Sequence, residues 1–294
     1  MAKKCMGKCA LCRQNDKELQ LSHIVPSFVG RKMLKTSPGL LRSTNEPNKA
    51  INDTEKHFML CHDCEELFSA KERWFANNIF NPFQDNNKKR FEYNENLTYF
   101  IISLSWRSLY LDLEEFSRDK TINRDILLNL YRSEGIMREY LLGKRQNLEN
   151  IQNHIFFFDK VQSGNNINLD MNPTEAMLRS ICSYSVNGDT SFTVSNLMGI
   201  LIVTFYSMET NEKWINTKIE PLSGIIEAQG QKFDSVVGYE IVNWMELAEQ
   251  AKNSLSEKQK AKIEAKIKAL GDDIKKYPFY QNWLNDQKLK HKLK

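Results

Sequence analysis

The hydrophobic and polar positions of the first eighty residues predict two strands and one helix around a long loop. Residues 19–26 alternate between apolar and polar side chains and end at a proline, a pattern typical of a short strand. A second apolar run, residues 57–60, predicts another strand. From Glu65 to Phe80, apolar residues recur at helical spacing. Residues 35–54, between the two strands, are rich in Ser, Thr, Asn, Pro and Gly and predict a loop.

Further along, the pattern changes twice. Helical spacing over residues 97–142 gives way to β-branched and aromatic runs over about 154–226, with a hairpin signal at Asn187-Gly188-Asp189. Ile215 to Ile226 is expected to add a strand at the end of this region. Helix returns over about 240–275, and the basic tail, 288–294, is expected to be mobile.

A domain boundary is predicted near residue 85. Asn81-Pro82 opens a polar joint that ends in three adjacent basic residues, Lys88, Lys89 and Arg90. We therefore predict an α+β protein with two domains. Residues 1–85 form the first, and residues 86–294 form a mixed companion domain of helices and antiparallel sheet.

Composition limits where this chain is expected to work. Its 294 residues are 41% hydrophobic and 27% charged, enough to bury a substantial core. The basic start has no apolar segment of a secretory signal behind it, and the apolar runs at 97–113 and 197–206 are interrupted or too short to span a bilayer. We expect a cytoplasmic protein that does not enter a membrane. In that reducing compartment, Cys-x-x-Cys pairs hold metal more often than they form disulfides.

The net charge of +4 is modest, but it is unevenly distributed. Residues 1–50 carry ten Lys or Arg against three Asp or Glu, a net charge of +7. Such a cluster has the sign expected of a phosphate-binding surface, although taken alone it is also typical of a solvated face. The basic cluster therefore indicates phosphate binding only in combination with the motifs of the same region.

Four cysteines of the first region form two Cys-x-x-Cys pairs, Cys9 with Cys12 and Cys61 with Cys64. A tetrahedral Zn²⁺ takes four thiolate or imidazole ligands, and each pair presents two sulfurs from one tight turn. Two pairs therefore complete a structural zinc site; the alternative is a chance spacing of buried cysteines. The 48 residues between the pairs exceed what a small zinc ribbon needs, so we expect the insertion, which contains His23, to carry function.

The order of these motifs resembles that of zinc-knuckled HNH endonucleases. The resemblance covers about the first eighty residues and rests on Cys9-x-x-Cys12, Ser22-His23-Ile24-Val25-Pro26, Asn48, and Leu60-Cys61-x-x-Cys64-Glu65 with Leu67-Phe68-Ser69. It implies a ββα-metal, treble-clef-like core, in which the knuckles hold a structural zinc and the two strands and the helix hold one catalytic divalent ion. It also implies that His23 is the general base of phosphodiester hydrolysis.

These implied roles agree with the chemistry of the residues. An imidazole takes up a proton near neutral pH, and a metal stabilises the charge that develops on the leaving oxygen. Many HNH enzymes carry Asp or His before the base and His after the last knuckle cysteine, where this chain has Ser22 and Glu65. Glu65 is a hard oxygen donor suited to Mg²⁺ or Mn²⁺. Glu72, seven residues later, lies on nearly the same helix face as Glu65.

The candidate residues also have structural interpretations. His23 could be a hydrogen-bonded structural histidine. Glu65 also suits the first turn of a helix, where the macrodipole favours an acid, and Glu72 also suits a solvated position. Asn48 is assigned to orient the base, but Asn52 precedes the same strand, and Asn48 also suits a turn.

The sequence therefore predicts a metal-dependent endonuclease acting on nucleic acid, with DNA expected over RNA. A regulated prokaryotic defence effector and a mobile-element or repair nuclease both agree with it. Because backbone contacts carry no direct sequence information, we expect residues 86–294 to serve target choice, control, a regulatory protein partner or homo-oligomerisation. The alternative, motivated by Ser22 and Glu65, is a catalytically inactive, zinc-stabilised nucleic-acid-binding or scaffold protein.

Overall fold

The first region is built on a three-stranded antiparallel sheet in the order β1-β2-β5. The computed structural model describes residues 5–36, 39, 41–158 and 172–292. Strands β1 (Cys5–Gly7), β2 (Lys17–His23) and β5 (Lys56–Cys61) precede α2 (His62–Phe75), which contacts both β2 and β5. The two predicted strands and the helix after them are confirmed.

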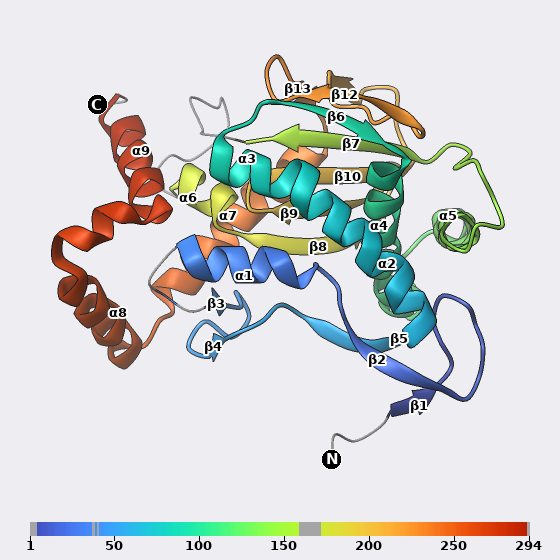
Figure 1. The fold of residues 1–294 in the computed structure, drawn as a ribbon, viewed down its shortest axis with the longest axis horizontal. Helices are drawn as coiled ribbons and strands as arrows, with labels where there is room; N and C mark the ends of the chain where they lie inside the picture. Colours follow the sequence, from blue (N-terminus) through green and yellow to red (C-terminus); the bar gives the residue numbers. More distant parts are fainter. Residues whose placement is uncertain (1–4, 37–38, 40, 159–171, 293–294) are drawn as a thin grey trace.

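The insertion between β2 and β5 contains one helix and one small hairpin. Helix α1 (Ser27–Thr36) follows Pro26, and β3 (Leu41–Arg42) pairs with β4 (Ala50–Ile51). The hairpin lies below α1 at the edge of the molecule in Figure 1. The predicted loop is thus irregular apart from these short elements.

The helical segment that begins with α2 continues through the predicted joint. A π-helical turn, η1 (Ala76–Phe80), leads into α3 (Asn81–Asn86), and β6 (Arg90–Asn94) follows. Apolar packing also crosses residue 85, because Val25 and Phe75 share one buried cluster with Phe100 and Ile155. The two predicted parts of the chain therefore pack together through shared cores.

A four-stranded antiparallel sheet lies at the centre of the companion region. Its order is β7-β10-β9-β8, with bounds β7 (Gln152–Phe157), β8 (Ile181–Val186), β9 (Ser191–Leu197) and β10 (Ile200–Ser207). All of its pairs are antiparallel, and the predicted hairpin at 187–189 joins β8 to β9. The expectation of antiparallel sheet is confirmed.

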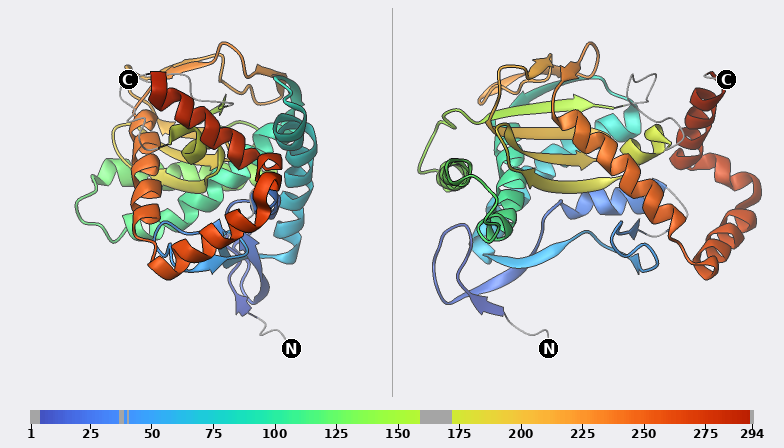
Figure 2. Two further views of the ribbon diagram at one scale, coloured as in Figure 1. Left: turned by 90° about the vertical axis from the view of Figure 1, so that its left-hand side faces the viewer. Right: turned by 180° about the vertical axis from the view of Figure 1, so that it is seen from behind.

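Helices cover both faces of this sheet. Ile200 and Ile202 of β10 pack with α4 (Glu95–Phe116), whereas Leu201 and Val203 pack with α7 (Val237–Asn253), as the alternation of side chains along a strand requires. Helix α5 (Arg124–Leu141) lies beside α4, and the two views of Figure 2 show the sheet between its helical layers. The middle of the molecule is thus helix, sheet and helix.

Two small ribbons complete the upper side of the molecule in Figure 1. Strand β11 (Lys213–Ile215) pairs with β13 (Lys232–Asp234), and β12 (Ser223–Glu227) pairs with β6, far away in sequence. The single strand expected over residues 215–226 is therefore two strands in separate ribbons.

The C-terminal part forms a helical arm at one edge. Helices α8 (Glu257–Leu270), η3 (Gly271–Lys276) and α9 (Pro278–Lys292) follow α7, and α9 packs on α6 (Pro173–Leu178). Residues 288–292 of the expected mobile basic tail belong to α9, while 293–294 lie outside the described residues. Within the described ranges, no helix is both long and apolar enough to cross a membrane.

Candidate functional site

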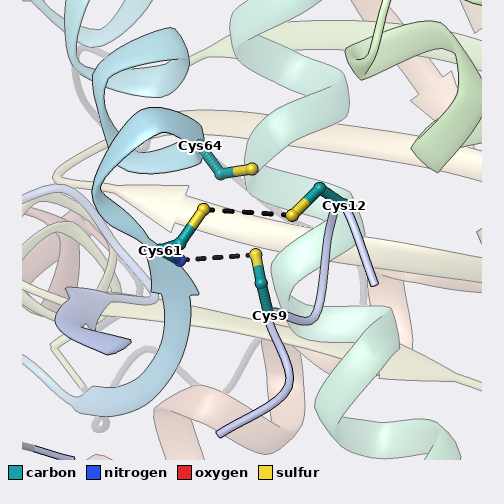
Figure 3. A group of neighbouring side chains, drawn as sticks. All are labelled: Cys9, Cys12, Cys61 and Cys64. Carbon is teal, nitrogen blue, oxygen red and sulfur yellow. Dashed lines mark hydrogen bonds between the residues drawn. The ribbon is translucent and has the colours of Figure 1, made fainter. Parts of the chain in front are cut away.

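The two cysteine pairs meet at the N-terminus of α2. Cys9 and Cys12 lie in the turn between β1 and β2, Cys61 ends β5, and Cys64 lies in the first turn of α2 (Figure 3). All four sulfurs lie within 4.8 Å of one another, and the Sγ atoms of Cys12 and Cys61 are 3.9 Å apart. Zinc–sulfur bonds of about 2.3 Å in a tetrahedron separate the sulfurs by about 3.8 Å. The donor set and its spacing fit one Zn²⁺.

The electrostatics of the cluster also favour a cation. The hydrogen bond with Cys64 lowers the pKa of Cys9 to about 4 even though burial opposes ionisation. The same hydrogen bond, with burial, raises the pKa of Cys64 far above its ordinary value, and burial raises the pKa of Cys12. One thiolate is thus favoured among protonated neighbours, and a bound Zn²⁺ would supply the positive charge that lets the others ionise.

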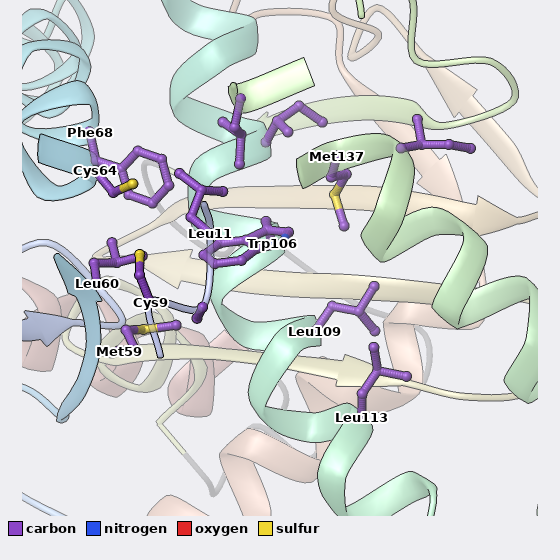
Figure 4. Packing of buried hydrophobic residues seen from close by; sticks show 14 of the residues in the cluster. Cys9, Leu11, Met59, Leu60, Cys64, Phe68, Trp106, Leu109, Leu113 and Met137 are labelled. Atoms are coloured by element: carbon purple, nitrogen blue, oxygen red, sulfur yellow. The ribbon is translucent and has the colours of Figure 1, made fainter. Parts of the chain in front are cut away.

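The cysteine cluster is part of a hydrophobic core. Figure 4 shows Cys9 and Cys64 beside Phe68, with Trp106 and Leu109 of α4 packed against the same cluster. Cys9, Cys61 and Cys64 are buried. Since all four ligands come from the chain and the surroundings are closed, the arrangement is that of a structural metal site.

His23 lies at the other end of β2, where the strand meets solvent. Its side chain is 23% exposed, and its Nε2 lies 3.0 Å from Oδ1 of Asp53. An ionised carboxylate only accepts hydrogen bonds, so Nε2 carries the proton of this pair and Nδ1 keeps a lone pair. The ring is held by one nitrogen and can accept a proton at the other.

Asp53 is kept ionised by its neighbours. The Thr54 N–H donates to Oδ1 at 2.9 Å, and Lys56 forms an ion pair with Oδ2. Burial opposes ionisation of Asp53, but the hydrogen bonds from Lys56, Thr54 and His23 outweigh it and hold the pKa of this carboxyl below its ordinary value. A carboxylate therefore faces His23 at neutral pH.

A buried arginine from α4 fixes the main chain beneath His23. Arg107 is 1% exposed; its Nη1 donates to the carbonyl oxygen of His23 at 2.5 Å, and its Nη2 donates to Oε1 of Glu72 at 2.6 Å. Its Nε donates to the carbonyl oxygen of Ser103 at 3.1 Å, and the guanidinium lies over the ring of Phe68. Arg107 thereby ties the end of β2 to α2 and α4.

The two acids of α2 already have partners in the protein. The hydroxyl of the fully buried Ser22 donates to Oε2 of Glu65 at 2.6 Å, and Glu72 is paired with Arg107. Among the described residues, the four cysteines are gathered as a metal-binding group of three or more side chains, whereas His23, Glu65 and Glu72 are not. Glu65 keeps the capacity to bind a cation, because Ser22 occupies only part of its carboxylate.

A β-bulge interrupts the pairing of β2 with β5. The pairing of β2 with β5 shifts by one residue near its middle, which leaves Met59 as the extra residue of β5. A bulge increases the local twist of a ladder. Leu19, before the shift, is buried, whereas Leu21, after it, is 47% exposed and Ser22 is fully buried. The face of β2 that carries Leu21 and His23 is therefore open where the face of Ser22 is covered.

Asn48 lies away from the imidazole and binds the C-terminal arm. Its Nδ2 donates to the carbonyl oxygen of Ser254 at 3.1 Å, and its Oδ1 accepts from the N–H of Ser256 at 2.8 Å. In the same hairpin, Arg42 donates to Oε1 of Gln259 at 3.1 Å. The side chain that contacts the ring of His23 is that of Asp53.

Sequence reasoning missed Asp53 and Arg107, although each left a signal. Asp53 lies three residues before the first residue of β5, but the HNH pattern directs attention to asparagines there. Arg107 interrupts an apolar run of α4, and an arginine on a buried helix requires a partner for its charge. Such a residue indicates an ion pair with another element.

A cavity of about 680 Å³ lies between the insertion and the companion sheet. Its walls come from α1, the β3–β4 hairpin, α6, β8 and α7, and Asp53 and Thr54 contribute to one side. A molecule in this cavity would therefore contact the residue that orients His23.

Comparison with known families identifies the N-terminal region. Residues 9–73 match the model of the HNH endonuclease family, so this stretch is an HNH endonuclease domain. The match begins at the first zinc-ligand candidate and ends within α2, so it includes both knuckles, His23, Glu65 and Glu72. The predicted resemblance is confirmed. No curated protein and no solved structure matches the chain.

Proposed function

We propose that the protein is a metal-dependent endonuclease that hydrolyses phosphodiester bonds in DNA, with His23 as general base. The observation that carries this proposal is the setting of His23 within an HNH domain. The imidazole is accessible, its Nε2 is bonded to an ionised Asp53, and its main-chain carbonyl is held by the buried Arg107. A ring fixed in this way presents Nδ1 to a water molecule.

Each residue around His23 has a defined part in this chemistry. His23 takes a proton from the attacking water at Nδ1, and Asp53 stabilises the imidazolium that forms, because its carboxylate bonds the Nε2–H. Arg107 positions the base through the main chain and does not touch substrate. The protein thus supplies the water-activating half of the reaction.

A divalent ion would be held chiefly by Glu65. Mg²⁺ in enzymes of nucleotide chemistry is bound by one or two carboxylates together with phosphate oxygens and waters, so one acid of the protein is sufficient. Glu72 fits this part less well, since Arg107 already neutralises it. When bound, Mg²⁺ or Mn²⁺ would neutralise charge on the phosphate and the leaving oxygen.

The cysteine cluster has a different task in this proposal. A Zn²⁺ bound by Cys9, Cys12, Cys61 and Cys64 would hold the β1–β2 turn against α2 and so keep β2 in place. It takes no part in the hydrolysis.

One observation favours a second function, a zinc-stabilised nucleic-acid-binding protein without cleavage activity. Ser22 stands where many HNH enzymes have a metal ligand, and its hydroxyl is committed to Glu65. In that case the basic N-terminal region would bind phosphates and His23 would be structural.

A plasmid assay separates the two functions. Purified protein is incubated with supercoiled DNA and Mg²⁺ or Mn²⁺, beside His23→Ala and the matched control His57→Ala, an imidazole on β5 that contacts Glu55. General-base catalysis contributes about 10²–10⁴-fold, so we expect a loss of at least about a hundredfold for His23→Ala and less than about twofold for His57→Ala. Equal nicking by wild type and His23→Ala, or none by wild type, rejects the nuclease function. A parallel reaction with structured RNA decides the substrate.

A further inference from the structure

Helix α8 is exposed along its whole length. None of its fourteen residues is buried, although most helices in globular proteins pack an apolar stripe against a core. An isolated helix of this length is only marginally stable in water, so α8 depends on its attachments. An exposed and attached helix of this kind has the properties of an interaction element.

Four lysines of α8 gather on one side of the helix. At about 100° per residue, Lys258, Lys262, Lys266 and Lys268 fall within an arc of about 160°. The only other residues in this arc are three alanines, 261, 265 and 269, and all seven positions are exposed. Glu257 and Glu264 lie about 20° and 40° beyond the edge of this arc that Lys268 forms. We call these seven positions the lysine face; four of them are lysines.

The start of α8 is attached to the nuclease insertion. Asn48 bonds the main chain of Ser254 and Ser256, which form the turn between α7 and α8, and Arg42 bonds Gln259 in the first turn of α8. Both residues belong to the β3–β4 hairpin region, whose chain continues to Asp53. The HNH domain therefore holds α8 directly.

The far side of the arm is attached to the companion region. Both carboxylate oxygens of the fully buried Asp286, on α9, accept hydrogen bonds from the first N–H groups of α6, those of Thr174 and Glu175, at 2.8 and 2.9 Å. Leu289 of α9 is also buried. Figures 1 and 2 show α8 between these two attachments, next to the hairpin and outside the layers of the sheet. The lysine face is thus on a helix held at both ends.

The attachment also limits how far α8 lies from His23. Asp53 is the fifth residue after Asn48. Fully extended, the chain from one to the other spans at most about 18 Å. Helix α8 adds about 21 Å, and one strand of DNA places a phosphate every 3.4 Å along the axis. Phosphates on the lysine face would therefore lie within about twelve base pairs of the cleaved bond.

We propose that the lysine face of α8 binds the sugar-phosphate backbone of the DNA duplex, and that Asn48 positions it relative to His23. The inference rests on the proposed function for its substrate, and it adds a second contact region outside the HNH domain. Lysines separated by alanines suit a phosphate backbone, because short side chains let the strand approach the helix and the ammonium groups reach it from both sides. Binding there is independent of sequence and sensitive to salt.

Binding measured without cleavage tests this proposal. In a His23→Ala background, Lys258→Gln/Lys262→Gln/Lys268→Gln is compared with the parent by fluorescence anisotropy on a 30-base-pair duplex over a range of salt concentrations. Glutamine is a good helix former, so α8 is retained. We expect the Kd to rise about tenfold at 100 mM salt and the slope of log K against log salt to become shallower by about 2–3, near one unit for each lysine lost.

The matched control removes the same charge elsewhere. Lys213→Gln/Lys218→Gln/Lys232→Gln changes three exposed lysines at and between β11 and β13, on the side of the molecule away from α8 in Figure 1. Its Kd is expected to change less than twofold. Equal weakening by both triple variants, or none by either, overturns the proposal. So does a change in oligomeric state of the α8 variant without a change in Kd, which would make α8 a protein-docking helix.

Asn48 is tested as a positioning residue by non-additivity. Asn48→Ala removes the bonds to Ser254 and Ser256, and we expect about threefold weaker binding in the parent but no further loss in the α8 triple variant, since the two act through the same contact. Asn45→Ala, in the same exposed loop, is the control. Additive losses would contradict the role of Asn48. Because every variant lacks His23, these results stand whether or not the plasmid assay detects cleavage.

Discussion

The cysteine cluster and the His23 site are built on the same strands and helix, yet they differ in almost every property. The cysteines Cys9, Cys61 and Cys64 are buried, whereas His23 and its partner Asp53 are 23% and 41% exposed. The cluster can satisfy a metal ion with its own four sulfurs, while His23 keeps one ring nitrogen for an external partner. One end of β2 thus lies in a closed core, and the other end is open to solvent.

The two sites also differ in how α4 supports them. Trp106 packs against the cysteine cluster as part of an apolar core, and the adjacent Arg107 reaches the His23 end with a buried charge. Apolar support tolerates small shifts, but a buried ion pair with hydrogen bonds requires defined positions. The companion region therefore contributes to the precision of the HNH site.

The largest expected effect comes from opening the cysteine cluster. Cys64→Ser replaces a thiolate with a poor zinc ligand, so bound zinc should fall from about one ion per chain to near zero and the first region should lose its folded state. Elemental analysis and thermal unfolding measure the two effects. Cys5→Ser, outside the cluster, should retain the zinc. Full zinc occupancy in Cys64→Ser would show that Cys64 is not needed to hold the metal, and the interpretation of the cysteine cluster as a closed zinc site would fail.

A smaller but substantial loss of stability is expected from Arg107→Ala. The change leaves Glu72 without its cation and the His23 carbonyl without its donor, and breaking a buried pair costs about 3–5 kcal/mol. Urea unfolding measures this loss, and zinc content should not change. Arg107→Met/Glu72→Gln should recover part of the stability, because no unpaired charge remains. If Arg107→Ala costs less than about 1 kcal/mol, the guanidinium does not support this site.

Asp53→Asn should have the smallest effect on stability and a specific effect on rate. Asparagine still accepts a hydrogen bond but cannot balance an imidazolium, so we expect cleavage to fall about 10–100-fold with little change in Kd for DNA. Asp85→Asn, an exposed acid paired with Lys32, is the control. An unchanged rate would show that Asp53 does not assist the base.

The stability effect of Asp53 should depend on pH. Because the pKa of this carboxyl is lowered in the folded protein, its stabilising contribution is present above the ordinary value near 4 and is lost as the pH falls through the lowered value. Wild type and Asp53→Asn should therefore differ in urea unfolding at pH 7, and the difference should shrink as the pH falls below about 4. A difference that grows on acidification would contradict the ion pair.

Local patterns predicted the elements of the HNH region because its signals are short in range. The spacing of Cys9 with Cys12 and of Cys61 with Cys64, the alternation before Pro26, and the helical spacing after Cys64 each involve a few neighbouring residues. The hairpin at 187–189 was predicted for the same reason.

Contacts between distant residues could not be predicted in this way. Asn48 was assigned to the base because it lies in the right loop, but its partners are more than 200 residues later in the chain. The pairing of β6 with β12 and the contact of Arg107 with His23 depend likewise on tertiary packing. Residues 288–292 of the basic tail belong to α9, which is anchored through Asp286, and composition does not reveal this contact.

The extra residue at Met59 has a consequence for transplanting this chemistry. Copying His23, Asp53 and Glu65 onto another strand pair with regular register would reproduce the functional groups but not the run of three buried residues, Met59, Leu60 and Cys61, that ends β5. Because Met59 lies two residues before Cys61, deleting it would also shift a zinc-ligand candidate, so a design must copy this register and the cysteine cluster together.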